Sequence, residues 1–213
     1  HIKSSVKPVL YVGGGCLNSG LKASEELIKF AELTNIPVTT TLHGLGCYPG
    51  NGKLSIGMLG MHGTYEANLA MHNCDLMINV GARFDDRITG RLDAFSPNST
   101  KFHFDIDKSS INKNVNVDFS TNTDIAHALS ALNLYIKSNN IEFNHNQISN
   151  WWGQIKEWQK TNCLNYEQGD EIIKPQHAIA RLNELTKNKE TIVTTEVGQH
   201  QMWAAQYFQF NKP

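Results

Sequence analysis

Two stretches decide the fold: Met58–Gly63, which reads Met-Leu-Gly-Met-His-Gly, and Asn79–Arg87, which reads Asn-Val-Gly-Ala-Arg-Phe-Asp-Asp-Arg. The second continues an apolar run that starts at Leu76 and ends in a Gly-Ala pair, followed by two arginines and two aspartates. Such a run is typical of a buried strand that opens into a polar, ligand-facing turn. The competing interpretation is a surface loop whose charges pair with one another. We expect the functional site at this turn.

Apolar, β-branched runs alternate with helical patterns through the first part of the chain. Strands are predicted at 8–12, 36–42, 76–80 and 101–107, and helices at 24–34, 64–72 and 124–132. Strands separated by helices of this length need crossover connections, which make neighbouring strands parallel. The sequence therefore predicts an α/β fold with an open parallel sheet flanked by helices.

The candidate groups stand at the ends of the predicted strands: Gly13–Gly15, Thr41–Leu42, Gly81–Arg87 and Asp105–Asp107. In open parallel sheets the ligand lies beyond the carboxyl ends of the strands, where all these groups would meet. A carboxylate in Asp105's position is suited to accept hydrogen bonds from ribose hydroxyls. Asp107 is instead expected to cap a short helix over 108–112.

The Gly13-Gly14-Gly15 loop allows two interpretations. Glycines let a phosphate or ribose approach the backbone, and a following helix start offers unpaired N–H groups. The dinucleotide fingerprint, however, requires a third glycine where Asn18 stands. A tight turn without a ligand is the commoner explanation of such a loop.

The composition changes after Ile136, which marks a linker. We divide the chain into a first domain (1–138), a linker (139–173) and the start of a second α/β unit (174–213). Within the linker, a helical stripe of aromatic residues predicts packing against a domain rather than cofactor stacking. The stripe consists of Trp151, Trp152, Ile155 and Trp158.

The second unit is expected to contain three elements. They are a helix at 175–185, a strand at 190–194, and a loop at 197–201 that opens a helix at Met202. The unit is cut off at Pro213, and the chain enters a strand soon after His1, so we expect a piece of a longer protein.

Composition excludes several classes of protein. The 213 residues carry a net charge of −1, so no overall field favours nucleic acid or an anionic membrane. The 4 cysteines form no CxxC pair, which argues against a zinc site and a disulfide-rich secreted fold. No apolar run reaches the roughly 18 residues of a membrane span. Partners should be small molecules or protein surfaces in a reducing compartment.

The two opening stretches, together with Val12–Gly15 and Val197–Ala205 (Val-Gly-Gln-His-Gln-Met-Trp-Ala-Ala), resemble the large catalytic subunit of acetolactate synthase, also called acetohydroxyacid synthase. The resemblance covers almost the whole chain. It implies the Rossmann-like central FAD-binding domain of a thiamine-diphosphate enzyme, then the start of its thiamine-diphosphate-binding domain. For the complete enzyme it implies decarboxylation of pyruvate and ligation to a second 2-keto acid in branched-chain amino-acid biosynthesis. FAD would take no part in net redox chemistry.

The resemblance also implies site residues. Those expected to line FAD are Gly13, Gly14, Gly15, Thr41, Leu42, Leu59, Gly60, Met61, His62, Gly81, Ala82, Arg83, Asp85, Asp105, Ile106 and Asp124. Those expected near the substrate are Met61, Asp86 and Arg87. Those expected at thiamine diphosphate are Val197, Gly198, Gln199 and His200. Neither His62 nor His200 is expected to act as a base. Thr123 departs from the glycine of many relatives, and His43 has no assigned role.

The magnesium-holding segment and the activating glutamate of that family are absent from these 213 residues. We therefore expect no catalytic residue or metal ligand here, and no activity from this piece alone. The resemblance implies other subunits of a homo-oligomer and a small regulatory subunit as partners. It implies a cytoplasmic location, or a plastid or mitochondrial one in a eukaryote.

Three other functions compete with the acetolactate synthase interpretation. A nucleotide-binding oxidoreductase explains the sheet but needs a hydride-accepting site that the sequence does not reveal. A sirtuin-like deacylase needs two zinc CxxC pairs, which the cysteine spacing excludes. A noncatalytic regulatory module stays open. A yellow protein that releases oxidised FAD would favour the acetolactate synthase interpretation over all three.

Overall fold

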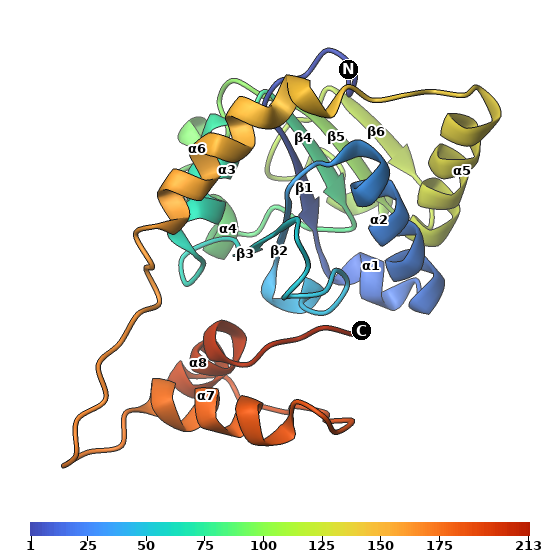
Figure 1. Cartoon of the computed structure of the whole chain (residues 1–213). Coiled ribbons are helices and arrows are strands. Elements are labelled where there is room, and N and C mark those ends of the chain that lie inside the picture. Colours follow the sequence, from blue (N-terminus) through green and yellow to red (C-terminus); the bar gives the residue numbers. More distant parts are fainter.

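The computed structural model describes residues 1–213 and has a six-stranded sheet at its centre (Figure 1). Every neighbouring pair of strands is parallel. Across the sheet the strands are β3 (Ser55–Met58), β2 (Val38–Thr40), β1 (Pro8–Val12), β4 (Leu76–Val80), β5 (Thr100–Asp105) and β6 (Phe119–Asn122). The strand order reverses between β1 and β4, which is where open α/β sheets commonly bind ligands.

Helices cover both faces of this sheet. The helices of the chain are α1 (Gly14–Asn18), α2 (Leu21–Thr34), α3 (Tyr65–Asn73), α4 (Asp86–Thr89), α5 (Ile125–Ser138), α6 (Ser149–Gln159), α7 (Pro175–Thr186) and α8 (Gln199–Tyr207). Short 3₁₀ turns are η1 (Leu42–Gly44), η2 (Leu92–Ala94), η3 (Lys108–Ser110) and η4 (His145–Ile148). α2 packs beside α5 on one face, and α3 beside α6 on the other (Figure 1). The predicted α/β fold with an open parallel sheet is confirmed.

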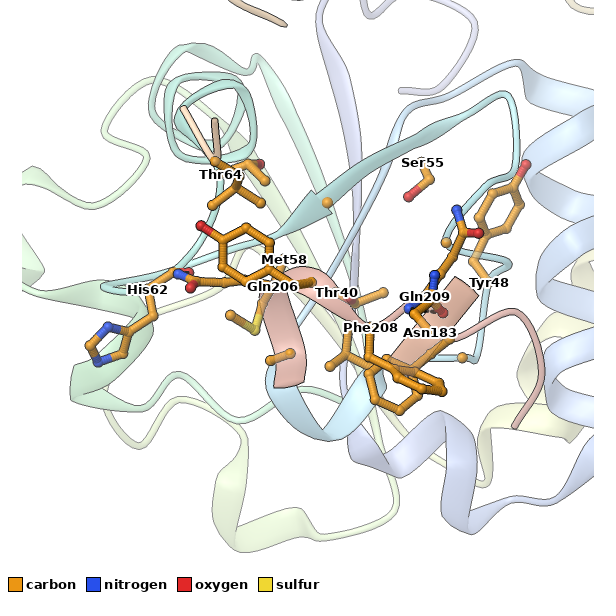
Figure 2. A pocket seen from close by; sticks show the side chains of 18 residues that line it. Thr40, Tyr48, Ser55, Met58, His62, Thr64, Asn183, Gln206, Phe208 and Gln209 are labelled. Atoms are coloured by element: carbon orange, nitrogen blue, oxygen red, sulfur yellow. Dashed lines mark hydrogen bonds between the residues drawn. The ribbon is translucent and has the colours of Figure 1, made fainter. Parts of the chain in front are cut away.

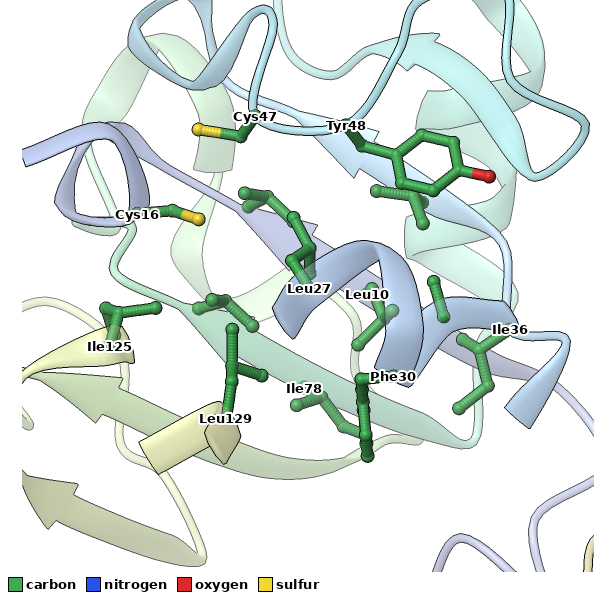
Figure 3. Packing of buried hydrophobic residues seen from close by; sticks show 14 of the residues in the cluster. Leu10, Cys16, Leu27, Phe30, Ile36, Cys47, Tyr48, Ile78, Ile125 and Leu129 are labelled. Carbon is green, nitrogen blue, oxygen red and sulfur yellow. The ribbon is translucent and has the colours of Figure 1, made fainter. Parts of the chain in front are cut away.

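The alternation of side chains along β1 divides the apolar core in two. Leu10 and Val12 point to the α2–α5 face, whereas Val9 and Tyr11 point to the α3–α6 face, and all four are buried. Figure 3 shows Leu27 of α2 and Leu129 of α5 gathered over the first face. Both faces of the sheet are therefore closed to water, as expected for a parallel sheet.

The aromatic stripe of α6 belongs to the core of the sheet domain. Trp151 is 1% exposed, and its indole N–H donates to the carbonyl oxygen of Pro8 at 3.1 Å. Ile155 is fully buried in the same cluster. The Trp152 indole donates to the carbonyl oxygen of Asn35 at 2.9 Å. The prediction that this stripe packs against a domain is confirmed.

Some predicted elements were wrong. Residues 190–194 form no strand, and Ile192 is 92% exposed. A strand is stabilised by hydrogen bonds to a neighbour, and no other strand lies beside this segment. α8 begins at Gln199 rather than Met202, and the helix expected over 108–112 is only the short η3. No helix of the chain is both long and apolar enough to cross a lipid bilayer.

Two strands were missed by the sequence patterns. β3 contains Gly57, which weakens a strand pattern, and β6 (Phe119–Asn122) is exposed throughout and polar after Phe119. Both strands lie at the edges of the sheet, where one side has no neighbouring strand to bury it. The expected cap at Asp107 is confirmed, because its carboxylate accepts the backbone N–H of Ser109 at 2.9 Å.

Candidate functional site

The loops at the carboxyl ends of the strands are joined by backbone hydrogen bonds. Gly13 N–H donates to the carbonyl of Val80 at 3.0 Å, and Gly15 N–H to that of Gly81 at 2.9 Å. Gly81 N–H in turn donates to the carbonyl of Phe104 at 2.9 Å. The ends of β1, β4 and β5 therefore form one continuous edge, which carries the predicted glycines.

Glycine is required at this edge by close contact between loops. A Cβ atom on Gly13 would lie under 3.0 Å from backbone atoms of Gly81 and Ala82, and one on Gly15 would lie 2.8 Å from the Cα of Gly81. Gly81 also has a φ of +64°, in the region that favours glycine. The tight-turn interpretation therefore has physical support. α1 has only 5 residues, so it adds little to an anion site.

Two buried polar side chains support the turn that follows β4. Asn79 is fully buried, donates to the carbonyl of Ala82 at 2.7 Å and accepts its N–H at 2.8 Å. The phenol of Tyr11 donates to the carbonyl of Arg83 at 3.1 Å, and burial raises the pKa of Tyr11, which keeps the hydroxyl protonated. Sequence reasoning missed both residues, although a polar Asn79 inside an apolar strand was a signal.

The two arginines of this turn take different partners. Arg83 pairs with Asp85 at 3.1 Å, and Arg87 with Asp86 at 3.0 Å. The side chains of Arg87 and Asp86 are 71% and 78% exposed. Ion pairs this exposed contribute below about 1 kcal/mol. The charge-pairing interpretation thus describes this structure, and a guanidinium so weakly held is free to exchange its partner for a ligand.

The Met58–Gly63 loop contacts the turn after β4. Met61 N–H donates to the carbonyl of Arg87 at 2.9 Å, and Gly60 has a φ of +104° close to the same carbonyl. The side chain of Asn68 binds Gly60 on both sides, accepting its N–H at 3.1 Å and donating to its carbonyl at 3.0 Å. Asn68 is a further supporting residue that the sequence did not reveal.

A cavity of about 380 Å³ lies between these loops and the start of α8. Its lining residues are Leu42, Met58, Leu59, Met61, His62, Arg87, Ile88, Val197, Gly198, Gln199, Gln201 and Met202. Residues predicted separately for FAD, substrate and thiamine diphosphate thus meet in one place. Asp86 and His200 are not among the lining residues.

A second cavity of about 340 Å³ lies between the loops after β2 and β3 and the end of α8 (Figure 2). Gln206 donates from its side chain to the carbonyl of His62 at 2.9 Å, and Gly50 N–H donates to the carbonyl of Phe210 at 2.9 Å. Figure 2 shows the His62 ring pointing away from Phe208. These bonds dock the C-terminal segment beyond the carboxyl ends of the strands.

The predicted residues on β5 and beyond β6 lie along the same edge but outside these two cavities. Asp105 is buried, and its Oδ1 accepts the N–H of Asp107 at 2.8 Å. Thr123, the residue that departs from glycine, donates its N–H to the carbonyl of Asp105 at 3.0 Å. Ile106 is 67% exposed. Thr41 lies in the neighbouring loop, donating its N–H to the carbonyl of Val12 at 2.8 Å.

Asp124 has a structural role in addition to the predicted one. It caps α5 by accepting the N–H of His127 at 3.2 Å, and it accepts the hydroxyl of Ser19 at 2.7 Å. Its contact with FAD stays a prediction. His43 is exposed, with its Cβ beside Gly14, and has no role that the structure reveals. No three His, Cys, Asp or Glu side chains are close enough together to hold a metal ion.

Removing the Asp124 cap should have a modest effect on stability. We expect Asp124→Ala to lower the free energy of unfolding by about 1 kcal/mol at neutral pH, whereas Asp124→Asn should keep most of the cap. The measurement is urea denaturation followed by circular dichroism. Equal stabilities of Asp124→Ala and the unaltered protein at pH 7 would contradict the capping role.

The stabilisation by Asp124 should also depend on pH. The Ser19 hydroxyl, as the main cause, holds the pKa of the Asp124 carboxyl below its usual value. A lowered pKa stabilises the fold above the unfolded-state value, and this contribution is lost as the pH falls through the folded-state value. The difference between Asp124→Ala and the unaltered protein should therefore shrink in acid.

Several known proteins are similar to this chain over almost its whole length. The chain is 47% identical to the "Acetolactate synthase large subunit" of Buchnera aphidicola subsp. Schizaphis graminum, over 97% of the chain and 35% of that protein. It is 44% identical to the "Acetolactate synthase isozyme 3 large subunit" of Escherichia coli, over 97% of the chain and 36% of that protein. It is 47% identical to "Acetolactate synthase 1, chloroplastic" of Nicotiana tabacum, over 100% of the chain and 31% of that protein. The chain spans about a third of the length of these relatives.

A family described as "Thiamine pyrophosphate enzyme, central domain" matches residues 1–132. These residues contain all six strands of the sheet and the loops at its carboxyl edge. The chain therefore belongs to the thiamine pyrophosphate enzyme family, with its central domain at residues 1–132.

Proposed function

We propose that this chain is part of an acetolactate synthase large subunit, which condenses pyruvate with a second 2-keto acid and releases CO₂ in branched-chain amino-acid biosynthesis. The observation that carries the proposal is the cavity in which Met61 and Arg87 face Val197–Gln199. It joins the residues proposed for substrate to those proposed for thiamine diphosphate. The similarity to large subunits of that name supports the same function. The relatives do not favour the alternative functions.

Two organic cofactors are part of this proposal. Thiamine diphosphate, held by Val197–His200, would supply the carbanion stabilisation that decarboxylation requires. FAD would lie along the carboxyl edge of the sheet. The backbone of Gly13–Gly15 and of Gly81–Arg83 would lie close to it, and Asp105 would bind its ribose. The Cβ positions of Gly13 and Gly15 are filled by the neighbouring loop, so the support for FAD here is that the predicted loops meet at one edge of the sheet. Mg²⁺ would be held by a part of the enzyme outside these 213 residues.

The proposed role of the protein groups is binding and orientation. The Arg87 guanidinium would grip the carboxylate of the keto acid with two parallel hydrogen bonds. Apolar side chains such as Leu59, Met61 and Met202 line the same cavity and would exclude water from it. We further propose that residues 1–138 are the FAD-binding domain, 139–173 the linker, and 174–213 the start of the thiamine-diphosphate domain.

The assembly and its location are also proposals. A homo-oligomer of large subunits would complete the active site, and a small regulatory subunit would bind it, in keeping with the name "large subunit" of several relatives. The proposed location is the cytoplasm, or a plastid or mitochondrion if the source is eukaryotic.

The test of the FAD proposal is titration of this chain by FAD, followed by flavin fluorescence. We expect weak but saturable binding, because the strand-end groups are present while little else would remove the flavin from water. Circular dichroism in the same samples would confirm that the protein is folded. Folded protein that shows no saturation at high micromolar FAD would contradict the proposal.

A further inference from the structure

His103 on β5 is a buried residue that the proposed function does not yet use. Its side chain is 0% exposed, and neither ring nitrogen makes a well-aligned hydrogen bond, although the carboxylate of Asp105 and the backbone of Ala82 lie near the ring. Buried polar groups in native proteins are nearly always hydrogen-bonded, and an unpaired one costs about 1–3 kcal/mol. An imidazole in this position therefore calls for a physical explanation.

His103 stands two residues before Asp105 on β5, so the two side chains share one face of the sheet. Nε2 of His103 is 3.4 Å from Oδ2 of Asp105, just outside the usual hydrogen-bond range. The other oxygen, Oδ1, already accepts the N–H of Asp107 at 2.8 Å. The ring of Phe84 packs against His103 edge-on, with centroids 5.3 Å apart, and limits its rotation. Closing this distance and aligning the N–H with Oδ2 would complete the bond.

His103 also belongs to a row of polar side chains that crosses the sheet. In the strand register, Tyr11 lies beside Asn79, and Asn79 beside His103. Tyr11 and Asn79 each hold a strand-end loop, through the carbonyl of Arg83 and the backbone of Ala82. His103 occupies the next position in this row, below the strand-end carboxylate of Asp105.

We propose that His103 is a positioning residue: its Nε2–H donates to Oδ2 of Asp105 and fixes the carboxylate to receive the ribose hydroxyls of an adenine nucleotide. This inference rests on the proposed FAD site and adds to it the group that orients Asp105. The Asp105 side chain keeps 10% of its surface exposed, which leaves its outer edge open to a hydroxyl.

The neutral form of the ring is sufficient for this role. Burial, as the main cause, lowers the pKa of His103 in spite of the opposing effect of Asp105. A neutral imidazole has one N–H, and placing it on Nε2 directs the donor at the carboxylate. The nitrogen-15 chemical shifts of the His103 ring report this tautomer without any ligand. A proton on Nδ1 alone would overturn the proposal.

The binding experiment compares His103→Phe, which keeps a ring but removes the donor, with His103→Gln, which carries an N–H at a similar reach. A carboxylate of Asp105 that is no longer fixed would lose its hydrogen bond from a ribose hydroxyl; loss of one such bond to a charged group costs about 1.5–3 kcal/mol, or roughly 10-fold to 150-fold in affinity. We expect His103→Phe to weaken FAD binding at least about 10-fold and His103→Gln to restore most of it. Unchanged FAD binding by folded His103→Phe would overturn the proposal.

The preference for ribose hydroxyls distinguishes a positioning role of His103 from a general loss of protein structure. Competition against FAD by ADP and by 2′,3′-dideoxyadenosine diphosphate measures the preference for ribose hydroxyls. The unaltered protein should prefer ADP, and both His103→Phe and Asp105→Asn should lose that preference. Combining the two changes should cause no further loss, because they remove one interaction. Equal weakening for both competitors, or independent losses in the double variant, would reject the positioning role.

The outcomes also distinguish this inference from the function on which it rests. Absence of FAD and ADP binding by the unaltered, folded protein would reject the FAD site and the inference together. Normal FAD binding that is insensitive to His103 would reject the inference alone. If His103→Phe does not fold, the affinity of His103→Gln and the tautomer of the unaltered protein still decide the question.

Discussion

Replacing Gly13 by alanine is expected to lower the free energy of unfolding by about 4 kcal/mol or more. The added Cβ would lie under 3.0 Å from the Cα of Ala82 and the carbonyl oxygen of Gly81, and backbone cannot rotate aside. Overpacking alone costs about 1–3 kcal/mol. Separating the loops would also weaken the bonds from Gly13 and Gly15 to the β4 side, each contributing about 0.5–1.5 kcal/mol. Native stability totals about 5–15 kcal/mol, so this loss approaches global unfolding.

A matched control is Gly153→Ala in α6, where no atom lies within 4 Å of the added Cβ. Alanine is favoured over glycine inside a helix by roughly 0.5–1 kcal/mol, so this variant should be more stable than the unaltered protein. Urea denaturation of both variants gives the comparison. If Gly13→Ala unfolds at the same urea concentration as the unaltered protein, the loop contact does not constrain the fold as described.

The second large effect concerns Arg87 and rests on the proposed function. In the full-length enzyme we expect Arg87→Lys and Arg87→Ala to reduce product formation at least about 30-fold, with FAD content near normal. Losing a guanidinium that grips a carboxylate in a partly desolvated cavity costs about 2–5 kcal/mol. At about 1.4 kcal/mol per factor of ten, that is roughly a 30-fold to several-thousand-fold loss. The Arg87–Asp86 pair at the surface would account for less than about 1 kcal/mol.

Arg91 provides the control for this experiment. It forms an exposed pair with Asp93, at 2.7 and 3.0 Å, and does not line the cavity of Arg87. Arg91→Lys should change steady-state kinetics by less than about 5-fold, the equivalent of an exposed ion pair. Normal kinetics in the Arg87 variants, or a loss of activity fully explained by lost FAD, would reject the role proposed for Arg87.

The sequence was most informative where local pattern and burial agree. β1 and β4 were predicted to the residue, because each is a mostly apolar run that is followed directly by a glycine. The strand at 190–194 was wrong for the opposite reason, since its β-branched residues have no partner strand here. A strand pattern describes a preference of the chain, whereas a strand also needs a neighbour.

The candidate site was also predicted only in part from the sequence. That the strand-end groups share one edge follows from the parallel order of the strands, and the structure places them there. The side chains that hold these loops in place could not be predicted from the sequence. Asn68 reaches Gly60 across 8 positions, and Tyr11 reaches Arg83 across 72. Such contacts depend on strand register and loop geometry, which no local pattern specifies.

The packing of α6 has a consequence for how this chain folds. Trp151 reaches back across 143 positions to Pro8, so the second face of the sheet closes only after α6 has been made. Contacts between distant residues form slowly, because the chain must first lose the entropy of a long loop. During synthesis from the N-terminus, α3 would cover only part of this face, and the part that α6 covers would stay open to solvent while α2 and α5 already cover the other face. A nascent chain that ends before α6 thus presents a broad apolar surface to chaperones.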